Sequence, residues 1–358
     1  MSKARRAYRI ERPHQRSGRA ADTIVVVLLL LFVLTVSPGL ANSKNADLQF
    51  IRRNITQDAI TATPPGWTED IRLTYTGNMW YPSIAVDGDI VHVAWANYTA
   101  PYDIFYRRST DLGRTWEAEK GISNVSTSGG GGTTAIAVNG STVHLIWEDD
   151  VPAGLMETFY ARSLDAGVTW SEPIQISEGN NSDSQTPSIA CWGNNVYVVW
   201  QDLRNGALNL DIYLKISNDA GTSWNIDKRL TTYGGNEGEA HIAVNDSNLH
   251  LAFVRRIGVP SVWEVYYTNT NDGGISWTPE VMISQDNDAH SLVGDIALNG
   301  SNIHVVWYDE KNLDGGEIYY RNSTDGGVTW NPEVRLTNNT NISDQPGISV
   351  SNNVIHIV

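Results

Sequence analysis

The sequence contains one cysteine, Cys191, in 358 residues, so no disulfide can form within a single chain. The fold must therefore rely on packing and on backbone hydrogen bonds. Basic residues are also few, because 25 Lys and Arg stand against 40 Asp and Glu and the net charge is −15. Since a phosphate backbone is bound by a basic surface, this balance argues against nucleic acid as a partner.

Helical periodicity is missing from the chain after residue 41, and histidines do not occur with Asp or Glu at metal-ligand spacing. The chain is nevertheless 41% hydrophobic, with 13 Trp and 15 Tyr, which is enough apolar material for a sizeable core. Short β-branched and aromatic runs are bounded by Asn, Asp, Gly and Ser. This pattern predicts an all-β fold, and nothing in it calls for a cofactor.

Residues 1–41 differ from the rest. A basic leader precedes an apolar run, "IVVVLLLLFVLTV" (24–36), whose 13 residues fall short of the roughly 20 that span a bilayer. This layout predicts a cleaved signal peptide, with a retained N-terminal membrane anchor as the alternative. Residues 42–66 form a linker. Either alternative makes the protein secreted or cell-surface, in contact with a membrane only through an uncleaved leader.

Ten Asn-x-Ser/Thr sequons follow the apolar run, and each exposed one is an acceptor for a glycan if the host glycosylates. The alternative is that a turn-rich sequence forms sequons by chance. They begin at Asn54, Asn97, Asn124, Asn139, Asn180, Asn245, Asn299, Asn322, Asn338 and Asn341.

An octet recurs five times along the chain. The copies are "STDLGRTW" (109–116), "SLDAGVTW" (163–170), "SNDAGTSW" (217–224), "TNDGGISW" (270–277) and "STDGGVTW" (323–330). Their final tryptophans are 54, 54, 53 and 53 residues apart. Such a fixed period is the signature of a repeat architecture.

Each octet lies in the same context. In the last repeat, an aromatic strand, "GEIYYRN" (316–322), precedes it, and an earlier strand, "IHVVW" (303–307), ends in tryptophan. A short strand begins the repeat, and "PEVRLT" (332–337) follows the octet. Four antiparallel strands per repeat at this spacing predict the blades of a β-propeller.

The two ends of the repeat array predict how the ring closes. The segment "WTEDIRLT" (67–74) matches a fourth strand, and "PGISVSNNVIHIV" (346–358) matches the first two strands of a blade. We therefore expect residues 67–358 to form a six-bladed propeller whose last blade is closed by the N-terminal strand. That blade lacks a third strand and an octet, which predicts a sequence truncated by roughly two dozen residues.

The octet pattern Ser-x-Asp-x-Gly-x-Thr-Trp resembles the Asp box, or BNR repeat, of the sialidase (neuraminidase) superfamily. The resemblance extends over about residues 67–358 and implies a sialidase-like six-bladed propeller, with each Asp box on the turn between the third and fourth strands. The Asp side chain can accept backbone N–H bonds in such a turn, and the tryptophan can bury a large area.

A carboxylate repeated five times around a ring cannot form a single active centre. The octets are therefore predicted to be structural, with calcium or ligand contact as the alternative. The residues concerned are Asp111, Trp116, Asp165, Trp170, Asp219, Trp224, Asp272, Trp277, Asp325 and Trp330.

The resemblance to sialidases also implies three arginines that bind the substrate carboxylate, a Tyr–Glu nucleophile pair and an acid/base Asp. The first arginine usually lies in a Phe/Tyr-Arg-Ile-Pro motif at the start of the first blade. The nearest string, "YRIERP" (8–13), precedes the apolar run, and no equivalent occurs near Pro82. No catalytic residue can be assigned, and this departure favours a non-catalytic protein.

Function should lie where the repeats differ, on the loops of the face opposite the octets. The fourth repeat has Arg255 and Arg256 where others have acids, and these could clamp a carboxylate or form a surface ion pair. The candidate ligand-binding residues are Asp149, Asp202, Arg204, Glu237, Glu239, Arg255, Arg256 and Asp309.

Two other recurrent sets are predicted to be structural. One is an acid just before each third strand: Asp103, Glu157, Asp211, Glu264 and Glu317. The other is a histidine on the second strand, which recurs at one position per blade and so cannot converge on one metal ion: His92, His144, His250, His304 and His356.

These observations favour an exported, non-catalytic propeller that binds glycans or other surface ligands. One alternative is an exo-acting glycoside hydrolase of the exo-α-sialidase type, which needs convergent arginines and a Tyr–Glu pair. A second is a scaffold that binds cell-surface proteins. The fold by itself does not distinguish them.

Overall fold

The computed structural model describes residues 70–74, 78–98, 103–123, 132–151, 154–178, 182–206, 209–259, 261–285, 287–311, 315–338, 341–351 and 354–358. The predicted leader, the linker and residues 67–69 lie outside these ranges. The regular elements within them are all β-strands. In this described part, no helix is long and apolar enough to cross a bilayer.

Five four-stranded antiparallel sheets form five blades. The first contains β1 (Met79–Asp87), β2 (Ile90–Asn97), β3 (Asp103–Ser109) and β4 (Lys120–Gly121). The second contains β5 (Thr134–Asn139), β6 (Thr142–Val151), β7 (Leu155–Ser163) and β8 (Ile174–Gln175). The third contains β9 (Ser184–Trp192), β10 (Asn195–Asp202), β11 (Asp211–Ser217) and β12 (Lys228–Arg229). The fourth contains β13 (Glu237–Asn245), β14 (Asn248–Ile257), β15 (Val262–Thr270) and β16 (Val281–Met282). The fifth contains β17 (Ser291–Asn299), β18 (Asn302–Asp309), β19 (Glu317–Ser323) and β20 (Val334–Arg335).

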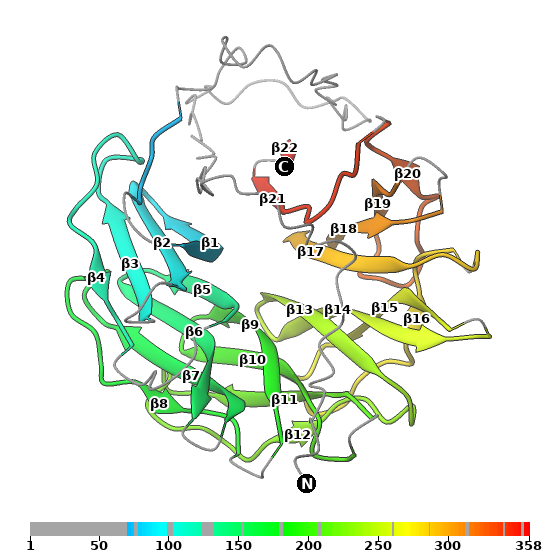
Figure 1. Cartoon of the computed structure of the whole chain (residues 1–358), viewed down its shortest axis with the longest axis horizontal. Helices are drawn as coiled ribbons and strands as arrows, with labels where there is room; N and C mark the ends of the chain where they lie inside the picture. The colour runs from blue at the N-terminus through cyan, green and yellow to red at the C-terminus, as the bar shows by residue number, and fades with distance from the viewer. Residues whose placement is uncertain are drawn as a thin grey trace, which may run out of the picture.

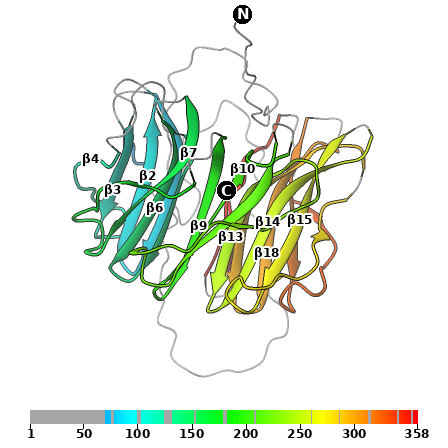
Figure 2. The same ribbon diagram turned by 90° about the horizontal axis from the view of Figure 1, so that it is seen from below.

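The first strand of each blade lies next to the centre of the ring, and the fourth lies at its outer edge (Figure 1). Figure 2 shows the strands running from one face of the ring to the other. Strand order therefore places the octet turns and the hairpins between first and second strands on one face. The remaining loops share the opposite face. The fourth strands are only two residues long, shorter than the sequence predicts.

The second strands of the second, third and fourth blades are buried because neighbouring blades cover both of their faces. In β14, Leu251 and Phe253 pack against the third blade, whereas Ala252 and Val254 pack against the fifth. Four of the aromatic residues near the ends of second strands are at most 1% exposed: Trp95, Trp147, Trp200 and Trp307. Continuous apolar runs such as "LHLAF" thus follow from burial on both faces.

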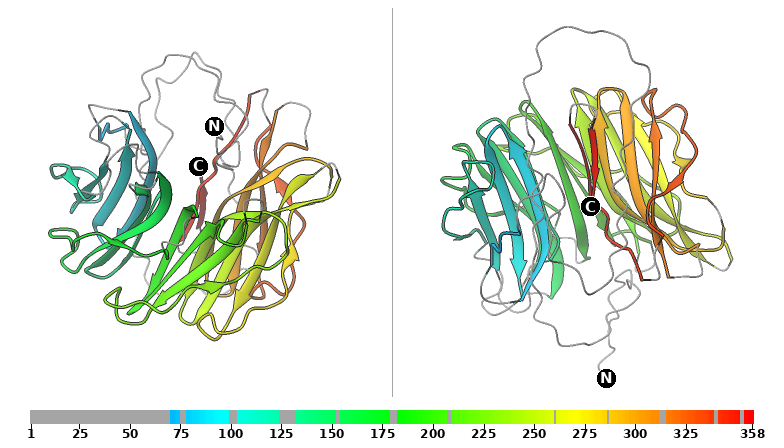
Figure 3. Two further views of the ribbon diagram at one scale, coloured as in Figure 1. Left: turned by 60° about the horizontal axis from the view of Figure 1, so that its bottom comes forward. Right: turned by 90° about the horizontal axis from the view of Figure 1, so that it is seen from above.

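The sixth blade is present only in part. β21 (Ile348–Ser351) and β22 (Val354–Ile357) form a two-stranded sheet, with β21 beside β17 of the fifth blade (Figure 3). The predicted six-bladed closure is therefore not observed as such. Among the described residues, five blades are complete and the sixth has two paired strands.

The segment 70–74 packs against the first blade. The side chain of Leu73 enters the core of that blade, and its carbonyl accepts a hydrogen bond from Arg107 Nη1 at 2.6 Å. Arg321 donates in the same way to the carbonyl of Ile283 in the preceding blade, at 2.8 Å. Residues 70–74 thus occupy the place that the outer segment of a preceding blade takes elsewhere in the ring.

Candidate functional site

The octets form the same hydrogen-bonded turn in every described blade. Asp325 Oδ1 accepts hydrogen bonds from Ser323 Oγ (2.8 Å) and the Thr329 N–H (2.9 Å), and Oδ2 accepts one from Thr329 Oγ1 (2.5 Å). The other four octet aspartates make the same set of bonds. These bonds, the Thr329 hydroxyl's first, lower the pKa of Asp325 to about 2. The carboxylates are therefore engaged within their own turns.

A histidine–tyrosine pair in the first, second and fourth blades contacts the octet of the blade that follows. In the second blade, His144 Nδ1 and Tyr160 Oη are 2.7 Å apart, and burial lowers the pKa of His144 to about 4, so the ring is neutral. Trp224 of the next octet packs edge-on against Tyr160, with ring centroids 5.0 Å apart. A Cβ at Gly221 would lie 1.8 Å from Tyr160 Oη, so this octet position has room only for glycine.

The third blade lacks this pair. Tyr197 stands in place of the histidine and Leu214 in place of the tyrosine. The glycine of the following octet, Gly274, then faces the Leu214 methyl group, and a Cβ there would lie 3.2 Å from it. Both partners thus change together, as expected of side chains that serve one contact. The recurrent histidines bond within their own blades and do not converge on one point.

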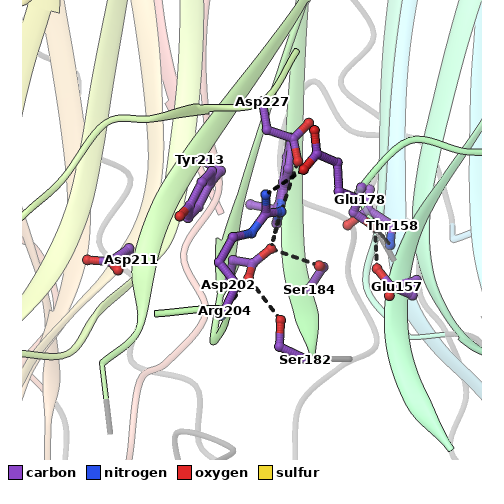
Figure 4. A network of polar contacts seen from close by, with 12 residues as sticks. Glu157, Thr158, Glu178, Ser182, Ser184, Asp202, Arg204, Asp211, Tyr213 and Asp227 are labelled. Carbon is purple, nitrogen blue, oxygen red and sulfur yellow. Dashed lines mark hydrogen bonds and ion pairs between the residues drawn. The ribbon is translucent and has the colours of Figure 1, made fainter. Parts of the chain in front are cut away.

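On the opposite face, Arg204 is enclosed by carboxylates of its own blade. Its Nη2 lies 2.6 Å from Asp202 Oδ2 and 2.9 Å from Asp227 Oδ2, and its guanidinium stacks 4.1 Å from the centre of the Tyr213 ring (Figure 4). The side chain is 14% exposed. Burial by itself would raise the pKa of Asp202, but hydrogen bonds from Arg204 and Trp200 hold it below its ordinary value.

Arg255 is enclosed in the same way in the fourth blade. It bonds to Glu237, with Nε 2.7 Å from Oε1, and to Glu280, and its guanidinium lies 4.5 Å from the Tyr266 ring centre. With 8% of the side chain exposed, this is a buried ion pair and not the surface pair considered from the sequence. The second-strand residue has the opposite charge to that of the third blade. There Asp202 pairs with Ser184 of the first strand, whereas here Arg255 pairs with Glu237.

The fifth blade repeats the arrangement with lysine. Lys311 Nζ lies 3.1 Å from Asp309 Oδ2 and 2.6 Å from Glu333 Oε1, over the ring of Tyr319 at 3.6 Å. Three neighbouring blades thus each hold one cation between two carboxylates on a tyrosine. Each of the three cations is bound within its own blade, so they do not form the convergent clamp that a sialidase-type mechanism needs.

In the described parts of the first two blades there is no such cation. Phe105 and Phe159 replace the tyrosine. Asp149 is fully buried, and among the described residues it has no cationic partner; it accepts bonds from Trp147 Nε1 (3.4 Å) and the Asp150 N–H (2.9 Å). Burial raises the pKa of Asp149 to about 6. It is therefore an uncompensated carboxylate in the second blade.

The acids predicted just before the third strands are instead the first or third residue of those strands, and they connect the third and fourth strands of their blade. Glu157 accepts a bond from Ser177 Oγ at 2.6 Å, and that oxygen accepts the Thr158 N–H. Glu264 and Ser284 repeat the pattern, while the carboxylates of Asp211 and Glu317 bind an arginine of the fourth strand. Asp103 accepts from Ser123 Oγ. Four of the five are at most 2% exposed: Glu157, Asp211, Glu264 and Glu317.

The inner strands have bulges near the opposite face. Tyr81, Thr186 and Glu239 have φ of 50°, 48° and 44°, a left-handed conformation that is unusual for residues other than glycine. The N–H of Thr186 is bonded by Glu148 Oε2 of the preceding blade (2.9 Å), and the N–H of Glu239 by Gln201 Oε1 (3.1 Å). Neighbouring blades therefore hold these bulges in place.

Three aromatic rings cluster at the bulge of the first blade. The ring centroids of Trp80, Tyr81 and Tyr98 lie 6.3–6.4 Å from one another, and all three residues are partly exposed. Thr134 Oγ1 of the second blade donates to the Tyr81 carbonyl at 2.7 Å, and this bond ties the backbone of Tyr81 to the neighbouring blade. We call these three residues the aromatic cluster.

Among the five complete blades that the structure describes, the aromatic cluster occurs only in the first. Trp80 and Tyr81 lie four and three residues before Ile84, and Tyr98 lies three residues after Trp95. The equivalent residues are Gly132, Thr133 and Asp150 in the second blade, Gln185, Thr186 and Leu203 in the third, Gly238, Glu239 and Arg256 in the fourth, and Leu292, Val293 and Glu310 in the fifth. Aligning the repeats column by column would have revealed the cluster, which searching for charged residues missed.

Two charged features of the fourth blade remain. Arg256 is exposed, and within the described part of the chain it forms no ion pair. His241 Nδ1 lies 3.7 Å from Asp295 Oδ1 of the fifth blade, and both side chains are 36% exposed. Asp295 Oδ2 also accepts the Ile348 N–H of β21 at 3.2 Å. No group of three or more His, Cys, Asp or Glu that could hold a metal ion occurs in the described ranges.

No protein-family model matches the chain, and no curated protein sequence does so either. Solved structures share its fold. A Trypanosoma rangeli sialidase is 11% identical with a TM-score of 0.53, over 80% of this chain and 52% of that one. A polysaccharide lyase of the ulvan lyase type is 13% identical with a TM-score of 0.53, over 75% and 72%. A Dyadobacter fermentans protein of unknown function is 15% identical with a TM-score of 0.53, over 78% and 93%.

These likenesses show that the chain has the propeller fold found in the sialidase superfamily. At such identities they show the fold alone.

Proposed function

We propose that this protein is an exported, non-catalytic propeller that binds glycans on the face opposite the octets. The aromatic cluster carries the proposal. One face of a sugar ring is a set of C–H groups that packs on aromatic rings, and the Tyr hydroxyls and Trp N–H offer polar contacts at the ring edges. Only one blade has aromatic side chains at these positions, which is expected of a ligand site and not of a structural repeat.

The state of the cations supports binding over sialidase-type hydrolysis. Arg204 and Arg255 are each engaged by two carboxylates of their own blade, so neither is available to clamp a substrate carboxylate. The fold also occurs in proteins that act on glycans, a sialidase and an ulvan lyase among them. We further propose six blades, because residues 70–74 contact the first blade as the outer segment of a preceding blade does.

The test is a glycan array probed with the full chain, followed by calorimetry on the glycans that bind. Trp80→Ala and Tyr98→Ala should weaken binding roughly tenfold or more, a loss of about 1.4 kcal/mol or above. Trp192→Ala is the matched control, because Trp192 is 47% exposed at the end of β9, on the octet face. It should leave affinity unchanged.

Three results would overturn the proposal. Absence of binding to every glycan, or equal losses for Trp192→Ala and Trp80→Ala, would remove the assigned surface. Turnover of a fluorogenic sialoside by the wild-type chain would show that the protein is an enzyme.

A further inference from the structure

The fourth blade carries charge at the positions where the first blade carries the aromatic cluster. Tyr81 corresponds to Glu239 and Tyr98 to Arg256, counted from the same inner-strand isoleucine and second-strand aromatic residue. Both blades therefore present these side chains at the same height, near the opposite-face end of the inner strand. We call Glu239 and Arg256 the charged station.

Arg256 differs from the other arginines on this face. Its side chain points to the sheet face opposite that of Arg255, because successive residues of β14 alternate. Arg255 is enclosed by Glu237 and Glu280, whereas Arg256 is exposed and forms no ion pair within the described ranges. An unpaired, exposed guanidinium retains its donors for a carboxylate outside the protein.

The backbone of Glu239 is held in place by the third blade. Its left-handed backbone conformation directs its N–H to Gln201 Oε1 of the third blade, at 3.1 Å. A carboxylate of this kind accepts hydrogen bonds from hydroxyl groups. The charged station thus combines a donor for a carboxylate with an acceptor for hydroxyls, and these groups complement the carboxylate and hydroxyls of a uronic acid unit.

The aromatic cluster and the charged station belong to different parts of the ring. β5 and β9 lie between β1 and β13 around its centre, so the stations are separated by two blades (Figure 1). A single sugar cannot reach both of them. A ligand that uses both must be a chain of several sugars.

Resting on the proposed glycan-binding function, we infer that the protein binds a linear, uronate-containing oligosaccharide across the mouth of the ring. One sugar unit packs on the aromatic cluster, and the carboxylate of a more distant unit pairs with Arg256. No bond is made or broken in this step.

The experiment compares hexagalacturonate with its fully methyl-esterified form, which has the same length but no charge. The wild-type chain should bind the acid roughly tenfold more tightly than the ester, as one charge-assisted contact of about 1.4 kcal/mol requires. Arg256→Gln should make the two affinities equal, whereas Trp80→Ala should weaken both. Arg114→Gln is the control, because Arg114 is an exposed arginine of an octet.

Length provides the second readout. Digalacturonate should bind at least tenfold more weakly than hexagalacturonate, since it reaches one station only. Equal affinity for dimer and hexamer, or an unchanged acid preference in Arg256→Gln, would overturn the inference. Binding of other glycans through the aromatic cluster without this preference would leave the proposed function standing and remove only the charged station.

Discussion

On the octet face, five blades present one turn with the same hydrogen bonds. On the opposite face the blades differ, with an aromatic cluster in the first blade, an uncompensated carboxylate in the second and an enclosed cation in each of the next three. The octet carboxylates bond within their own turns. On the opposite face, Arg255 is paired with neighbouring carboxylates, and burial raises the pKa of Asp149. The residues that repeat in every blade therefore form the scaffold. The residues that differ between blades form the surface on which a ligand can be bound selectively.

The largest expected effect comes from Arg255→Ala. It would leave Glu237, which is fully buried, without its cation, and removing one partner of a buried pair costs about 3–5 kcal/mol. The free energy of unfolding from urea titration measures it. Arg256→Ala, one residue away but exposed, should stay within about 0.5 kcal/mol. Equal effects at the two positions would contradict the difference in burial and pairing.

A smaller effect is expected from Gly221→Ala. The added Cβ would meet Tyr160 Oη at 1.8 Å, and the residue has φ of +77°, so overpacking should cost about 1–3 kcal/mol. Gly274→Ala is the matched variant, with φ of +94° but a Leu214 methyl group in place of the hydroxyl. Gly274→Ala should therefore lower the free energy of unfolding less than Gly221→Ala, as measured by thermal unfolding. If Gly274→Ala were the more damaging change, the tyrosine contact would not explain the glycine.

The mildest test changes only the pH. The pKa of Asp325 is lowered to about 2, so the stability that this group contributes is present above its ordinary pKa and is lost as the pH falls towards 2. The pKa of Asp149 is raised to about 6, so its ionisation weakens the fold as the pH rises from about 4 through 6.

Carboxyl carbon shifts in NMR should show these two midpoints. Asp149→Asn should stabilise the chain more at pH 7 than at pH 4. Similar midpoints for Asp325 and Asp149 would remove the contrast between the faces.

The blades could be predicted from the sequence because each repeat carries its own strand pattern and turn chemistry. The octet spacing located β19 and β20 from local residues alone. The enclosure of Arg204 could not be predicted, because Asp227 approaches it only when β10, β11 and β12 pair in one sheet. Trp80 and Tyr98 could have been found by aligning the repeats, but their contact could not be predicted, because they are 18 residues apart in sequence and meet across the β1–β2 pair.

Contacts between neighbouring blades pair particular residues across each boundary. Tyr160 needs Gly221 of the next blade, and Glu148 binds the N–H of Thr186 there, so complementary residues lie on either side of a boundary. Tyr160 and Gly221 both lie in the outer halves of their sheets, and Glu148 and Thr186 both lie in the inner halves. The partners at a boundary therefore belong to two whole adjacent blades. A chimaera that exchanges one blade would mismatch both of its borders, whereas one that exchanges two adjacent blades would keep the partners of the border between them.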